Sequence, residues 1–182
     1  MKKFLGLLVI LMMIASNCFA RGMYGERSKE LLNDMYREPS KYIDFGCVGM
    51  GMFFYLDKTS IQVDQYNPPN YIIAFREIPF SINGGNHAYD NHNEFTRYKY
   101  DYKSRKMYRE VYRNGDKNQP YWREVDSNPK GWKGEGDSRH VWLAEGEVAF
   151  YLAYDMNFYE KPMSKLLQEY LQTGKWKTFE RK

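Results

Sequence analysis

The order of residue patterns along the chain is the feature that most limits its fold. Between residues 42 and 125, runs rich in Phe, Tyr, Ile and Val are separated by short segments with Gly, Asn or Pro, whereas apolar residues beyond residue 140 recur at helical spacing. Short connections favour antiparallel neighbours, because a parallel crossover needs about a dozen residues or more. Strands followed by helices predict an α+β fold: a single domain with one antiparallel sheet of about five to six strands, packed by C-terminal helices.

Six segments have the composition and alternation expected of strands. The clearest pair is a hairpin over 95–112, in which Tyr98, Tyr100 and Tyr102 alternate with charged residues and therefore share one face. We expect cross-strand tyrosine pairs to fix its register. The predicted strands are 52–56, 60–65, 71–82, 95–102, 106–112 and 121–125.

Three segments have helical spacing. Residues 26–37 predict a short helix that ends before Pro39. In 142–156, small residues such as Ala149 recur at helical spacing, and they would let the helix lie close to the sheet. A third helix is expected to begin near Pro162 and to end at Gly174.

The first twenty residues have the layout of a secretory signal peptide. A basic start precedes an apolar run over 4–15, and the small residues Cys18 and Ala20 follow at the spacing of a cleavage site. We expect 1–20 to be a signal peptide and 21–182 to be one domain, exported to the periplasm, the cell surface or the medium. In the alternative, Cys18 is the acylated first residue of a lipoprotein. No later stretch approaches the roughly 18 apolar residues of a membrane-spanning helix, so none is expected after cleavage.

Removal of residues 1–20 changes both the net charge and the cysteine content. The formal net charge falls from +4 to +2, because the segment contains two lysines and no acidic residue. A charge this small does not indicate a polyanionic partner, and we expect no nucleic-acid binding. Cys47 becomes the only cysteine, so no intramolecular disulfide can form and the fold depends on its core. Aromatic residues, 18% of the chain, can supply such a core.

Few residues offer catalytic or metal-binding chemistry, and we expect no cofactor and no metal. Cys47 needs a nearby base to act as a nucleophile, and the candidates are His87, His92 and His140. His87 and His92 also lie in one loop, but histidines five positions apart do not share a helix face and a loop is weakly preorganised for metal. The glycines over 46–51 lack the Lys-Ser/Thr pair and the following helix of a phosphate-binding loop.

Basic and aromatic side chains are interleaved between residues 95 and 132. Aromatic residues and arginine are enriched at binding hot spots, so an exposed group of this kind indicates a partner, either a protein or a glycan. We expect Trp132 to be exposed, since lysine and glycine flank it on both sides. The candidate partner-binding residues are Trp132, Arg97, Lys99, Arg109 and Arg113.

One series of segments resembles a known family. The chain carries Phe-Tyr-Leu-Asp-Lys-Thr-Ser-Ile at 54–61, Tyr-Ile-Ile-Ala-Phe at 71–75, Tyr-Lys-Tyr-Asp at 98–101 and Arg-Lys-Met-Tyr-Arg at 105–109. Over about residues 42–125, this series resembles the small secreted domains of the surface-adhesin protein E type. The resemblance implies a central sheet and adhesive binding of host or matrix proteins through surface segments, without chemistry. Asp57 and Ser60 match the family's strand entry, and we interpret them as turn residues.

Together these features predict a non-enzymatic, secreted or envelope-associated binding domain that contacts a protein or a glycan. Two alternatives stay open. One is an envelope enzyme that uses Cys47 or the His87/His92 loop, and the other is a structural accessory protein of the cell envelope.

Overall fold

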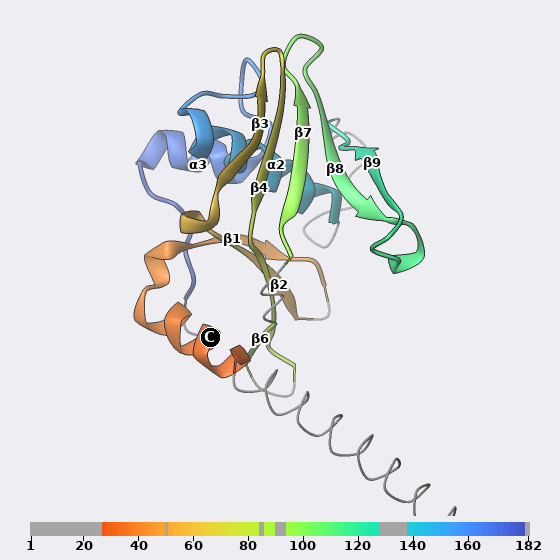
Figure 1. Cartoon of the computed structure of the whole chain (residues 1–182). Helices are drawn as coiled ribbons and strands as arrows, with labels where there is room; N and C mark the ends of the chain where they lie inside the picture. Colours follow the sequence, from red (N-terminus) through yellow and green to blue (C-terminus); the bar gives the residue numbers. More distant parts are fainter. Residues whose placement is uncertain (1–26, 50, 84–85, 90–93, 128–137, 181–182) are drawn as a thin grey trace, which may run out of the picture.

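The computed structural model describes residues 27–49, 51–83, 86–89, 94–127 and 138–180, and it confirms a single α+β domain (Figure 1). The strand pairings in these ranges are antiparallel, as the short connections predicted. The strands belong to two sheets, of four and five strands, where the sequence pattern predicted one sheet of about five to six. Both sheets pack with helices, including the C-terminal ones.

The predicted strand over 71–82 is two strands, and its division creates the second sheet. β4 (Asn70–Phe75) and β5 (Glu77–Ser81) are separated only by Arg76. The Arg76 N–H donates to Ser60 Oγ at 2.7 Å, and its carbonyl accepts from the Asp57 N–H at 3.2 Å. Because the backbone of Arg76 bonds to the connection after β2, the chain passes from one sheet to the other here.

The five-stranded sheet contains the predicted hairpin. Its order is β3-β4-β7-β8-β9, and β7 pairs with β8 through Tyr98 opposite Arg109 and Tyr100 opposite Met107. The expected cross-strand tyrosine pairs are therefore wrong, because this register places Tyr108 opposite Lys99 on the other face of the sheet. Tyr98 and Tyr100 are fully buried and face helix α2 (Ser138–Tyr154), which confirms that they share one face. The bounds of the remaining strands of this sheet are β3 (Gln62–Asn67), β7 (Thr96–Asp101), β8 (Lys106–Tyr112) and β9 (Pro120–Glu124).

The four-stranded sheet lies at the other end of the molecule in Figure 1, next to a helix over 27–37. Its order is β1-β2-β5-β6, and the sequence patterns did not predict β1 or β6 as strands. The C-terminal segment also joins β1, because Phe179 N–H donates to the Tyr42 carbonyl at 3.1 Å. The buried Phe179 ring then packs edge-on against Tyr36, Tyr55 and Phe80, with centroids 5.3 to 5.5 Å apart. The bounds are β1 (Tyr42–Cys47), β2 (Met52–Asp57) and β6 (His87–Ala88).

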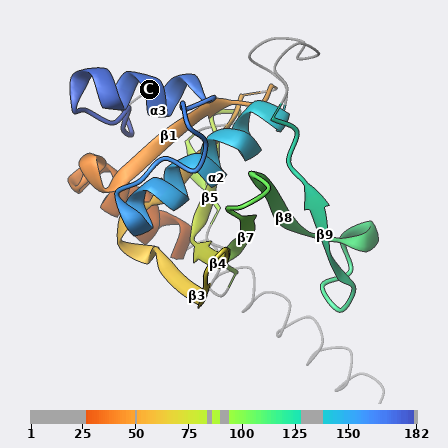
Figure 2. The same cartoon turned by 90° about the horizontal axis from the view of Figure 1, so that it is seen from above.

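Helix α2 packs against the five-stranded sheet, and Figure 2 shows it between that sheet and helix α3 (Lys165–Thr173). The helix lies close to the sheet at Gly146. A Cβ atom at Gly146 would lie 2.0 Å from Met107 Sδ, and the Gly146 carbonyl accepts from the Tyr100 hydroxyl at 2.8 Å. The helix ends before Met156, which is 45% exposed, so the predicted end at residue 156 is wrong.

Helix α3 is held by a carboxylate from α2. Glu147 is fully buried, and it accepts from the backbone N–H groups of Met163 and Ser164 at 2.7 and 2.6 Å. Gly174 follows the helix with φ 68°, as expected for a glycine at this end. Within the described ranges, no helix is both long and apolar enough to cross a membrane.

Candidate functional site

The candidate partner-binding residues do not share one surface. Arg97 and Lys99 point away from α2, whereas Arg109 pairs with Tyr98 in the sheet and therefore points toward α2. Arg113 is exposed in the 3-10 turn η3 (Arg113–Gly115) after β8. Trp132 lies outside the described residues.

The face of the five-stranded sheet opposite α2, here called the outer face, collects aromatic and charged side chains from three neighbouring strands. Lys99 lies at its centre on β7. Its Nζ is 4.7 Å from the ring centroid of Tyr108 on β8 and 5.3 Å from that of Trp122 on β9. All three side chains are partly exposed, so two rings and one ammonium form a continuous surface across three strands.

Other basic side chains on the outer face are paired with acidic ones. Arg97 Nε lies 2.8 Å from Asp64 Oδ2, and its Nη1 lies 3.5 Å from Glu110 Oε2. Lys106 is 3.3 Å from Glu124. Acidic side chains therefore accompany these basic residues of the hairpin, and the outer face is not a basic patch.

On the opposite face, Arg109 is the centre of a buried charge cluster, here called the Arg109 cluster. Its guanidinium donates to Glu77 Oε2 and lies 3.6 Å from Glu145 Oε2. Glu145 also accepts from the Tyr98 hydroxyl at 2.6 Å, and Glu77 accepts from Thr96 Oγ1 at 2.7 Å. Charge-assisted hydrogen bonds, which are the stronger ones in proteins, thus join β5 to β7 and β8 at Glu77, and the Tyr98–Glu145 hydrogen bond joins β7 to α2.

Glu145 is the fully buried carboxyl of the Arg109 cluster. Burial raises the pKa of Glu145 to about 8, against the opposing effect of Arg109, and the negative charge of Glu77 adds to the rise. Its Oε1 has no hydrogen-bond partner among the described residues. The sequence patterns did not single out Glu145, although a signal exists: Glu-Gly-Glu at 145–147 interrupts an apolar helix, and buried acids in such a helix need partners.

A pocket of about 360 Å³ opens beside the Arg109 cluster. Arg109 and Glu77 line it together with Thr96, and the indole of Trp142 lies 4.9 Å from the guanidinium carbon. Apolar side chains from the same strands and the segment before β7 complete the wall. They include Pro79, Phe95 and Val111.

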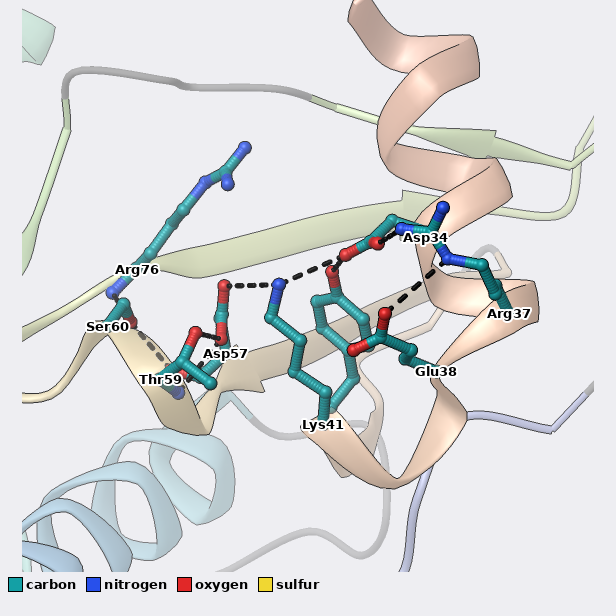
Figure 3. Close-up of polar contacts among 9 residues, drawn as sticks. Asp34, Arg37, Glu38, Lys41, Asp57, Thr59, Ser60 and Arg76 are labelled. Carbon is teal, nitrogen blue, oxygen red and sulfur yellow. Dashed lines mark hydrogen bonds and ion pairs between the residues drawn. The ribbon is translucent and has the colours of Figure 1, made fainter.

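A second polar network joins the helix over 27–37 to the rest of the domain (Figure 3). Asp34 accepts from Arg37 at 2.6 Å, from Lys41 at 3.0 Å and from the Tyr42 hydroxyl. Lys41 Nζ also lies 3.6 Å from Asp57, whose Oδ1 accepts from the Thr59 N–H at 2.9 Å. The Tyr42 and Lys41 hydrogen bonds lower the pKa of Asp34 to about 2.

That second network holds turns and helix ends in place. Asp57 and Ser60, matched to the family's strand entry, lie in it as the predicted turn residues. Asp57 caps the 3-10 turn η2 (Lys58–Ser60), and Ser60 Oγ donates to the Asp57 carbonyl at 2.6 Å. The carboxylates make bonds within the protein, so this network has a structural role.

The described residues considered for catalysis, Cys47, His87 and His140, lie on three different elements, β1, β6 and α2. Cys47 is a free, partly exposed cysteine at the end of β1, and its Sγ accepts from the Gly49 N–H at 3.4 Å. His87 is exposed on β6, and His92 lies outside the described residues. Among the described residues, no group of three or more His, Cys, Asp or Glu is placed to hold a metal ion.

Comparisons with protein-family models, with curated proteins and with solved structures find no match.

Proposed function

We propose that this protein is an exported, non-enzymatic domain that binds a protein partner through the outer face of its five-stranded sheet. The observation that carries the proposal is the group formed by Lys99, Tyr108 and Trp122. Its members come from three adjacent strands and are held in contact, so the group is preorganised for binding. The signal-peptide pattern of residues 1–20 and the resemblance over about residues 42–125 support the same function.

The chemistry of the outer face favours a protein over a polyanion. Tyr, Trp and Arg are the residue types enriched at protein interfaces, and all three are present here. Arg97 is already paired with Asp64 and Glu110, so the face offers little net positive charge to a polyanion. A partner with mixed charges and apolar groups fits this surface better.

The test compares two substitutions at neighbouring positions of β9. Trp122→Ala removes a ring from the outer face, whereas Tyr121→Ala removes a 44% exposed ring that points to the other face. Purified extracellular-matrix proteins and a glycan array serve as immobilised probes for the mature protein. Truncation of a hot-spot tryptophan costs about 2 kcal/mol, so we expect Trp122→Ala to bind about 30-fold more weakly.

Tyr121→Ala should bind like the wild type. Equal binding by Trp122→Ala and the wild type would contradict the proposed surface, and glycan binding that Trp122→Ala abolishes would contradict the proposed partner. Reaction of Cys47 with an alkylating reagent in the folded protein tests the enzyme alternative, since a nucleophilic thiol must be accessible and reactive.

A further inference from the structure

We propose that the pocket beside the Arg109 cluster binds a neutral sugar ring, either a free hexose or the terminal residue of a glycan. This site is separate from the Lys99, Tyr108 and Trp122 group on the outer face. It lies at the ends of β5 and β8, against Trp142 of α2.

The floor of the pocket offers hydrogen-bond donors and acceptors side by side. A guanidinium has five N–H groups, and the contacts of Arg109 with Glu77 and Glu145 leave others for a ligand. Within the part of the chain that the structure describes, Glu77 receives side-chain hydrogen bonds from Arg109 and Thr96, both on Oε2, which leaves Oε1 for a ligand. A hydroxyl group both donates and accepts, so vicinal hydroxyls can bond to Arg109 and Glu77 together.

These floor groups are also fixed in position. The side chains of Arg109 and Glu77 are only 14% and 9% exposed, and each bonds to neighbours on other strands. The Arg109 guanidinium also lies near Trp142, on the side of α2. A ligand therefore meets polar groups that are already ordered, which lowers the entropy lost on binding.

The charges around the pocket favour a neutral ligand. The carboxylates that line it are Glu77, Glu94 and Glu110, and each lies next to a basic side chain: Arg109, Lys117 and Arg97 respectively. An anion would approach three carboxylates, and a cation would approach the buried Arg109. Neither ion meets a net charge of opposite sign in the pocket, whereas an uncharged polyol does not need one.

The size and the apolar wall indicate one ring rather than a longer chain. The volume of about 360 Å³ is near the lower end of the range of about 300–1,000 Å³ for small-molecule sites. Pro79, Phe95 and Val111 provide apolar surface for the C–H groups of a pyranose, and the polar floor faces its hydroxyls.

The experiment titrates the mature protein with methyl glycosides of glucose, galactose and mannose, followed by NMR shifts of backbone amides. The matching uronic acids and 2-amino sugars test the preference for a neutral ring. Disaccharides that carry the bound ring at the non-reducing end distinguish a glycan terminus from a free hexose.

Val111→Trp fills the pocket with an indole and leaves the residues of the Arg109 cluster unsubstituted. Glu77→Gln removes one acceptor while keeping the shape of the side chain.

We expect Val111→Trp to abolish binding and Glu77→Gln to weaken it about tenfold, as for the loss of one hydrogen bond. Tyr66→Ala, which truncates a 68% exposed ring on the distant strand β3, should bind sugar like the wild type. Equal binding by Val111→Trp and the wild type overturns the proposal, as does a preference for the charged sugars or no binding at all. Trp122→Ala should keep sugar binding, so failure of this site and failure of the outer face are distinguishable.

Discussion

Replacing Gly146 with alanine should destabilise the protein, although alanine is the better helix former. The added Cβ would lie 2.0 Å from Met107 Sδ and 2.9 Å from Tyr98 Cδ1. Attractive contacts between carbon atoms are about 3.5–4.0 Å long, so α2 must move away from the sheet or Met107 must change its rotamer. Met107 and Tyr98 are both fully buried, which leaves little room for either response.

The net cost follows from three contributions. Overpacking a core costs about 1–3 kcal/mol, and alanine recovers about 1 kcal/mol of helix propensity. Movement of α2 also stretches the 2.8 Å hydrogen bond from the Tyr100 hydroxyl to the Gly146 carbonyl, which contributes about 1 kcal/mol. We therefore expect Gly146→Ala to lower the free energy of unfolding by about 2 kcal/mol and the melting temperature by about 4–8 °C.

Urea unfolding of the mature protein, followed by circular dichroism, measures this change. The control is a double-mutant cycle with Met107→Ala, which makes room for the new methyl group. Met107→Ala alone should cost about 2–5 kcal/mol, and the double variant should cost less than the sum of the two single ones. A Gly146→Ala protein as stable as the wild type, or more stable, would refute the close seating of α2 on β7 and β8.

Three further predictions concern charges and processing. Because the pKa of Glu145 is raised to about 8 in the folded state, the folded protein keeps a proton that the unfolded chain releases above about pH 4.3, and stability falls as the pH rises between these values. Glu145→Gln should flatten that fall in urea unfolding at pH 5 to 8, and an unchanged slope would contradict the assignment. The lowered pKa of Asp34 has the opposite effect on the pH dependence of stability. The contribution of Asp34 to the free energy of unfolding is present above about pH 3.9 and is lost as the pH falls toward about 2. Asp34→Asn should therefore cost about 1 kcal/mol at pH 7 and much less near pH 2 in thermal unfolding, whereas an equal cost at both pH values would contradict the pairing. Mass spectrometry of the exported protein should give Arg21 as its first residue, and an acylated Cys18 would establish the lipoprotein alternative instead.

The periodicity of the sequence predicted strands that have one buried and one exposed face. The alternation of Tyr98 and Tyr100 with charged residues describes a strand with one buried face, and the hairpin over 95–112 forms with that face buried, although no tyrosine pairs with another across it. The apolar run over 71–82 carries no such information about pairing, because its residues are suitable for the core on either side of Arg76. Which strand pairs with which depends on contacts far apart in the sequence, so the division into two sheets was not predictable from the pattern.

In the candidate site, the burial of Arg109 was likewise not predictable from the sequence pattern. Alternation along β8 places Arg109 with Met107 on the face that packs against α2, but a surface position is the ordinary expectation for an arginine. The burial of Arg109 depends on carboxylates from two other elements, Glu77 on β5 and Glu145 on α2. Only the fold brings these three residues together, and no sequence prediction used the acids of the apolar helix, which need buried partners.

The stability of this fold and the geometry of its candidate pocket depend on the same helix position. Gly146 allows α2 to approach β7 and β8 more closely than any other residue type would, and Glu145 is the residue before it. At that short separation, Glu145 reaches both the Tyr98 hydroxyl and the Arg109 guanidinium. A helix moved outward by a methyl group would lengthen both contacts and leave Arg109 with Glu77 as its main partner. Glycine at position 146 thus lowers the stability of the helix itself, but it allows the Glu145 contacts that hold the pocket floor in place.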